Sequence, residues 1–108
     1  RSCFDGCSSL KKVSIGSGIE SVESGAFAGC SLLDEVVITE GAKYIGTWAF
    51  ADCPNLASVS LPKSIERIEP TAFDRCNRIE RVYIPKGTTD YFMRFDALKQ
   101  FRHRFMEL

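Results

Sequence analysis

Apolar side chains recur along this chain with a period of 23 residues, and polar side chains fill most positions between them. Each copy has a phenylalanine followed three residues later by a cysteine: Phe4, Phe27, Phe50, Phe73 and Cys7, Cys30, Cys53, Cys76. Aliphatic residues keep the same phase at further positions: Leu10, Leu33, Leu56, Ile79; Val13, Val36, Val59, Val82; Ile15, Ile38, Leu61, Ile84. A unit this short cannot bury its own apolar face, so the copies must stack as coils of a solenoid. The pattern predicts about four coils.

Residues 26–48 illustrate the elements expected in one coil. Ala26, Phe27 and Cys30 share a face at three- and four-residue spacing, which predicts a short helical turn. Residues 35–38 place β-branched side chains inward and predict a short strand. Equivalent strands are expected to align as a parallel sheet near residues 12–15, 35–38, 58–61 and 81–84. The return leg of each coil is expected to bury two more apolar residues: Ile19 and Val22, Ala42 and Ile45, Ile65 and Ile68.

The pattern changes after Pro85, where aromatic residues become frequent. The sequence of residues 89–98 predicts a helix. Phe101, Phe105 and Leu108 are expected to lie back across the last coil. The open end of a solenoid leaves strand groups unpaired and apolar side chains bare, so it needs a cover. We therefore interpret residues 86–108 as a C-terminal cap of the same domain. Residues 1–85 hold the four repeats, of which the first is incomplete.

The repeated string Ala-Phe-x-x-Cys-x-x-Leu-x-x-Val-x-Ile resembles the BspA-like, or Treponema-type, leucine-rich repeat. The resemblance covers residues 1–85, and Ile84-Pro85-Lys86-Gly87-Thr88 with the aromatic tail is similar to the usual end of that family. It implies an α/β-type solenoid, a right-handed superhelix with a parallel sheet on one face. It also implies a bacterial or protozoan secreted or cell-surface protein that acts in binding or adhesion and is not an enzyme.

Charge and hydropathy exclude two classes of partner. The chain has 14 basic and 14 acidic side chains, so no net charge attracts nucleic acid or an anionic membrane. No apolar run approaches the roughly 20 residues of a membrane span, so membrane insertion is not expected.

The cysteines invite a disulfide interpretation, but their register favours buried thiols. Stacked cysteines one repeat apart have parallel Cβ vectors about 4.8 Å apart, outside the usual disulfide window of about 3.5–4.5 Å. Cys3 and Cys7, in the incomplete first coil, are the two expected to be exposed and open to oxidation. Only this pair has zinc-ligand spacing, and the lone His103 lies in the cap, so we predict no metal site or cofactor.

Nothing in the sequence indicates catalysis. His103 is flanked by Arg102 and Arg104, and no nucleophile, base and orienting group occur as a set. Gly16-Ser17-Gly18 resembles a phosphate-binding loop in composition only, because it lacks the lysine of that motif.

The outward positions of the predicted sheet are the candidate partner-binding residues: Ser14, Val37, Ser60 and Tyr83, flanked by Lys12, Glu35, Ser58 and Arg81. Val37 and Tyr83 suit an interface, although both also have high strand propensity. Trp48 is a further candidate, because the equivalent residues are Gly25 and Thr71; the alternative is that its ring covers the edge of a coil.

Two functions follow from this architecture. The first is a non-catalytic interaction module that binds a protein or glycan partner through the sheet face. The alternative is a structural terminal segment of a longer repeat array, with no ligand of its own. In that case the first coil, around Phe4, Leu10 and Val13, is expected to be adhesive, and a homodimer through it is a further expectation.

Overall fold

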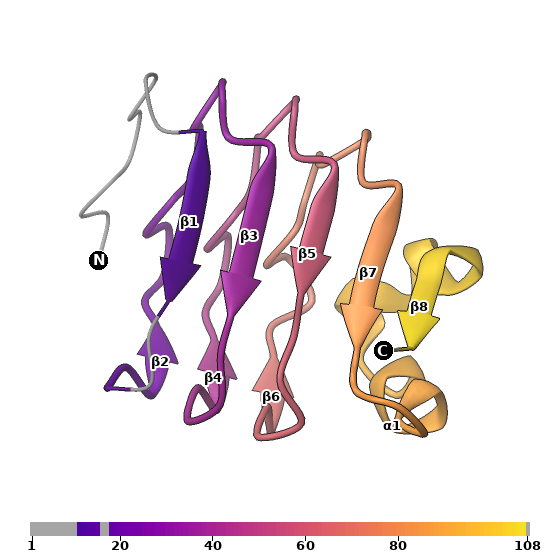
Figure 1. Cartoon of the computed structure of the whole chain (residues 1–108). Helices are drawn as coiled ribbons and strands as arrows, with labels where there is room; N and C mark the ends of the chain where they lie inside the picture. Colours follow the sequence, from indigo (N-terminus) through magenta and orange to yellow (C-terminus); the bar gives the residue numbers. More distant parts are fainter. Residues whose placement is uncertain (1–10, 16–17, 108) are drawn as a thin grey trace.

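The computed structural model describes residues 11–15 and 18–107 and shows a stack of coils (Figure 1). Each coil contributes one strand to a large parallel sheet, and the C-terminal segment adds a fifth, in the order β1-β3-β5-β7-β8. These strands span Lys12–Ile15, Glu35–Ile38, Ser58–Ser60, Arg81–Ile84 and Phe105–Glu107. A second parallel sheet, β2-β4-β6, spans Ser21–Val22, Tyr44–Ile45 and Arg67–Ile68. The parallel sheet predicted from the repeat is therefore confirmed, and the second sheet was not foreseen.

In both sheets, residues that pair across neighbouring repeat strands are one repeat apart in the sequence. Lys12 pairs with Glu35, Glu35 with Ser58, and Ser58 with Arg81. The return leg follows the same rule, because Tyr44 pairs with Ser21 on one side and Arg67 on the other. Every strand position therefore forms a row across the stack.

The core consists of the repeated apolar positions. The Phe27, Phe50 and Phe73 rings stack almost parallel, with centroids 5.3 Å and 5.4 Å apart. Cys30 and Cys53 are fully buried beside them. One predicted core residue differs: Ile19 is 47% exposed, whereas its equivalents are fully buried. No described coil lies on its outer side. Of the predicted incomplete first coil, Cys3, Phe4, Cys7 and Leu10 lie outside the described residues, as does Leu108, whereas Val13 is described and buried.

The predicted helical turn at residues 26–30 is a series of turns and not a helix, but Ala26, Phe27 and Cys30 are all buried, as its spacing predicted. The Phe27 backbone N–H donates to the Ala49 carbonyl of the next coil, at 2.7 Å, and Gly29 N–H donates to Ala51 at 2.9 Å. A helix needs these N–H groups for its own i−4 carbonyls. In this segment the N–H groups of Phe27 and Gly29 bond to the next coil instead.

The C-terminal segment covers the last coil, but as three short elements instead of one helix over residues 89–98 (Figure 1). α1 spans Thr89–Met93 and the 3₁₀ helix η1 spans Asp96–Arg104. Phe95 separates them with an extended backbone, φ −86° and ψ 119°. This break lets Phe92, Phe95 and Phe101 all be buried. β8 then pairs with β7 and covers the edge of the sheet. No helix in the described part of the chain has the length and apolar character needed to cross a bilayer.

Candidate functional site

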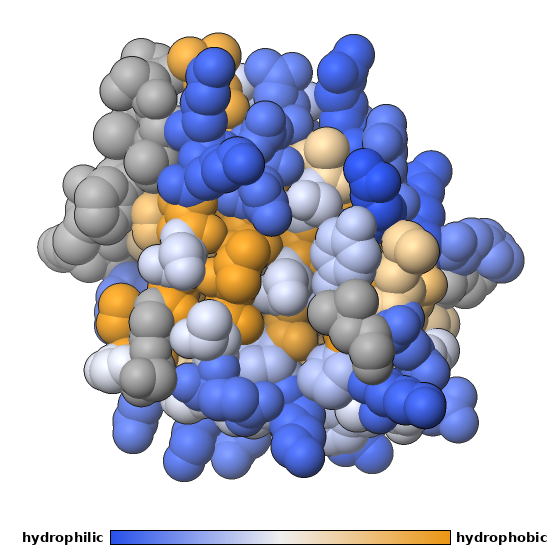
Figure 2. Space-filling model, in the orientation of Figure 1, coloured by the Kyte–Doolittle hydropathy of each residue, from blue (hydrophilic) through white to orange (hydrophobic). Residues whose placement is uncertain are grey.

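The outer face of the large sheet holds the predicted central row. Strand register aligns Ser14, Val37, Ser60 and Tyr83 across four strands, as the repeat predicted. β8 adds Met106 beside Tyr83, and Met106 is 45% exposed. Figure 2 views this face, and pale to orange atoms form a band across its middle, between blue margins above and below. The structure thus extends the predicted row by one apolar residue.

The flanking row is polar and lies at the start of the same strands. It contains Lys12, Glu35, Ser58 and Arg81 in register. Lys12 Nζ lies 3.4 Å from Glu35 Oε1, and both side chains are well exposed. An exposed pair of this kind contributes little stability, roughly 0–1 kcal/mol, so it serves mainly to match neighbouring coils.

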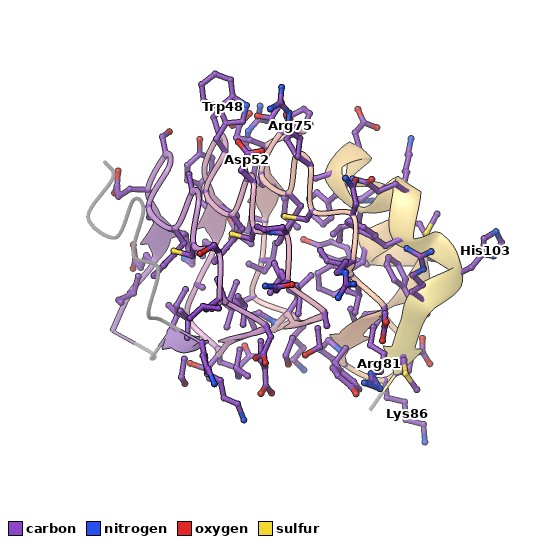
Figure 3. The ribbon with its side chains drawn as sticks, turned by 90° about the horizontal axis from the view of Figure 1, so that it is seen from above. Trp48, Asp52, Arg75, Arg81, Lys86 and His103 are labelled. Atoms are coloured by element: carbon purple, nitrogen blue, oxygen red, sulfur yellow. The ribbon has the colours of Figure 1, made fainter. Side chains whose placement is uncertain are left out.

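Trp48 lies elsewhere, on the side of the molecule opposite Arg81 (Figure 3). The residue is 55% exposed, and its backbone φ is 58°, in the left-handed region. The equivalent Gly25 has φ 67°. Trp48 therefore occupies a turn position where the previous coil has glycine, and much of its ring faces solvent.

A shallow groove of about 280 Å³ lies beside this tryptophan. Its lining residues come from the turn segments of successive coils: Ala28, Trp48, Ala51, Asp52, Asp74 and Arg75. Arg75 Nη1 lies 3.7 Å from Asp52 Oδ1, and both side chains are more than half exposed. Figure 3 shows Trp48, Asp52 and Arg75 gathered at one edge. The structure thus joins Trp48 to three charged residues that the sequence did not single out.

One sequence signal for the groove was present. Asp52 and Arg75 occupy the repeat position of Gly29, and all three residues have positive φ, at 56°, 65° and 76°. A glycine replaced by charged residues in later copies marks a turn whose side chains must leave the stack. Without the fold, that signal did not show that Trp48 would share the surface.

The repeated cysteines form an internal row. Cys30, Cys53 and Cys76 are buried, as the register predicted. The adjacent Cys76 thiol and burial together raise the pKa of Cys53. A buried thiol with a raised pKa is a poor nucleophile, because the thiolate is the reactive form.

The second sheet presents a polar cluster. Glu69 Oε2 accepts hydrogen bonds from the Tyr44 hydroxyl, at 3.0 Å, and from Arg67 Nε, at 2.8 Å. The Arg67 and Tyr44 hydrogen bonds lower the pKa of Glu69, and the bond to Glu69 raises the pKa of Tyr44. Because each group has a partner within the cluster, its polar groups link coils and leave little capacity for a ligand.

His103 is exposed in η1. Within residues 11–15 and 18–107, no three His, Cys, Asp or Glu side chains gather in a way that suits a metal ion. Cys3, Cys7, Gly16 and Ser17 lie outside that part, so the predictions on them stay predictions.

Stacked parallel strands, a one-repeat register and a covered C-terminal end define a leucine-rich-repeat solenoid. Residues 1–100 match the family described as BspA type leucine rich repeat region (6 copies). Because this match spans most of the chain, the chain belongs to the BspA-type leucine-rich-repeat family, as the sequence resemblance implied.

A solved structure has the same fold. It is a leucine rich cell surface protein from Faecalibacterium prausnitzii A2-165, with a TM-score of 0.50 and 24% sequence identity. The match covers 82% of this chain and 30% of that one, so the chain corresponds to less than a third of that protein's length. No curated protein matches the sequence.

Proposed function

We propose that this chain is a non-catalytic interaction module that binds a protein partner through the outer face of the β1-β3-β5-β7-β8 sheet. The observation that carries the proposal is the row formed by Val37, Tyr83 and Met106 among small serines. Interface centres are enriched in aromatic residues and methionine and depleted in charge. The row has this composition, with charged residues at its margins.

The exposure of the sheet supports the same function. Parallel sheets are usually buried on both faces, because crossover segments cover them. In the described part of the chain, β1, β3, β5 and β7 bury one face only, since their side chains alternate between buried and partly or fully exposed. An open parallel face made rigid by stacked coils offers a partner a preorganised surface, which lowers the entropic cost of binding.

The proposed location is outside the cell, as a secreted or surface-attached protein. The BspA-type repeat resemblance motivates it, and the fold-matched protein from Faecalibacterium prausnitzii is described as a cell surface protein. Adhesion to another cell or to its matrix is the corresponding role.

Binding to immobilised extracellular-matrix proteins tests the proposal. We expect saturable binding to at least one of them, weakened about tenfold or more by Val37→Asp and by Tyr83→Ala, as for residues at an interface centre. Lys43→Ala is the matched control, because Lys43 is exposed just before β4, outside the large sheet. Full binding by both sheet variants, after circular dichroism shows them folded, would exclude the sheet face as the site.

A further inference from the structure

Backbone strain is concentrated at one surface of this molecule. Among the described residues, three other than glycine have positive φ: Trp48, Asp52 and Arg75. All three line the 280 Å³ groove described above. Positive φ is unfavourable for residues with a Cβ, and most of all for bulky ones. Strained residues of this kind cluster at functional sites, so the groove is a candidate for one.

The fold gains little packing from these residues. Trp48 is 55% exposed, and the side chains of Asp52 and Arg75 are 56% and 74% exposed. Gly25 and Gly29 fill the equivalent positions in the previous coil, also with positive φ. The coil therefore closes with glycine alone, and the three larger residues require an explanation other than stability.

The chemistry of the groove selects the kind of ligand. Trp48 offers an indole face, Asp52 and Asp74 offer hydrogen-bond acceptors, and Arg75 offers planar donors. The groove carries charges of both signs, so it presents hydrogen-bond donors and acceptors side by side. A neutral ligand with both hydroxyl donors and acceptors, together with an apolar C–H face, satisfies every group. A pyranose ring has these properties, and its C–H edges carry the partial positive charge that an aromatic face attracts.

The polar groups are available to such a ligand. The Asp52–Arg75 pair is long, at 3.7 Å, and exposed, so little is lost when it opens toward a hydroxyl. Asp74 makes no ion pair within the described residues; its backbone groups bond Asp52 and Thr71 instead. The volume lies just below the range, from about 300 Å³, of pockets for drug-sized ligands, which suits one sugar ring of a larger glycan.

From this geometry we infer that the groove lined by Trp48, Asp52, Asp74 and Arg75 is a glycan-binding site that stacks one pyranose ring on the indole. The site goes beyond the proposed protein-binding face and does not depend on it, because Figure 3 places Trp48 and Arg81 on opposite sides. Failure of either function leaves the other standing.

The single tryptophan of the chain makes the test direct, because its fluorescence reports this groove alone. The full chain is titrated with the methyl pyranosides of glucose, galactose, mannose and N-acetylglucosamine. Sorbitol is the control ligand, since it carries hydroxyls but no ring face. We expect a saturable change in emission with at least one pyranoside and none with sorbitol. Asp74→Asn should weaken the affinity about tenfold, through loss of a charged hydrogen-bond acceptor. Lys43→Ala, outside both the sheet face and the groove, should leave it unchanged.

Trp48→Gly provides the second arm. This variant restores the residue of the previous coil and is expected to fold. Saturation-transfer NMR, which needs no tryptophan, should then lose the signal of the pyranoside that the unaltered chain binds. Absence of saturation with every pyranoside would overturn the inference. So would binding retained by Trp48→Gly, or saturable quenching by an oligolysine peptide in place of the sugars.

Discussion

The Cys76 thiol donates a 2.8 Å hydrogen bond to the backbone carbonyl oxygen of Phe50, 26 residues earlier in the chain. Cys53 makes the same bond to Phe27, at 3.3 Å. The phenylalanine and cysteine that repeat together in the sequence are therefore joined between neighbouring coils. Cysteine suits this position because it is small, tolerates burial and still supplies a donor.

Loss of that donor should destabilise the stack. Cys76→Ala removes the bond and leaves the Phe50 carbonyl without it in a buried setting, at a cost of about 1–3 kcal/mol in the free energy of unfolding. Urea denaturation followed by circular dichroism measures the loss. Asn77→Ala, at the exposed neighbouring position, should change the same quantity by less than about 0.5 kcal/mol. Equal effects of the two substitutions would contradict the structural role of the thiol.

The Cys53 thiol should also make stability depend on pH in the alkaline range. Its neighbour Cys76 and its burial raise the pKa of Cys53 in the folded chain, whereas an unfolded cysteine titrates near pH 8.5. Above that pH the unfolded state loses a proton that the folded state keeps. The contribution of Cys53 to the free energy of unfolding should therefore be constant below about pH 8.5. Above that pH it should fall by up to roughly 1.4 kcal/mol per pH unit.

Unfolding free energies measured between pH 7 and pH 10 test this dependence. Cys53→Ala removes the titrating group, so its curve should fall less steeply than that of the unaltered chain. A slope unchanged by the substitution would show that other groups cause the alkaline loss.

Replacing a left-handed turn residue by glycine should increase the stability of the fold. Arg75→Gly should raise the free energy of unfolding by about 1 kcal/mol, because glycine adopts positive φ without steric cost. The lost ion pair to Asp52 is exposed and contributes little. Thr71→Gly is the matched control: Thr71 shares the repeat position of Trp48 but does not have positive φ. At that position, substitution by glycine should lower the free energy of unfolding by roughly 0.5–1 kcal/mol. A loss of stability in both variants would mean that Arg75 is not strained.

At Gly46, where two coils approach closely, replacing glycine should instead reduce stability. A Cβ added at Gly46 would lie 2.8 Å from the Ser24 backbone nitrogen and 2.9 Å from the Val22 carbonyl oxygen. Gly46→Ala should therefore push the coils apart and lower stability by about 1–3 kcal/mol. Gly18→Ala should have little effect, since a Cβ there meets nothing within 4 Å. Thermal denaturation of the two variants compares them, and similar melting temperatures would show that the backbone adjusts at no cost.

The sequence predicted the structure correctly wherever a residue lies beside the equivalent residues of the neighbouring coils. The aligned strands, the buried cysteines and the outward row through Val37 and Tyr83 all follow from a single period. The family resemblance rests on that same period. In such a stack each residue has equivalents as neighbours, so local pattern and long-range contact carry the same information.

The errors arose where the repeat stops or where backbone bonds decide the structure. Nothing in the pattern showed that Phe95 would break the cap helix, or that Phe105–Glu107 would pair with β7. The turn at residues 26–30 has helical spacing, yet its N–H groups bond the next coil. Ile19 fits the repeat but has no described neighbour on one side. The groove at Trp48 depends on side chains from successive coils, which the period alone does not place together.

Site-specific photo-crosslinking on intact cells tests the central claim, the outer sheet face as a protein-binding surface. Benzoylphenylalanine replaces Tyr83 in one variant of the native protein and Lys43 in another, and the cells are irradiated in the presence of their natural surroundings. We predict a discrete protein adduct from position 83 and none from position 43. Adducts from position 43 alone, or equal adducts from both positions, would contradict the account.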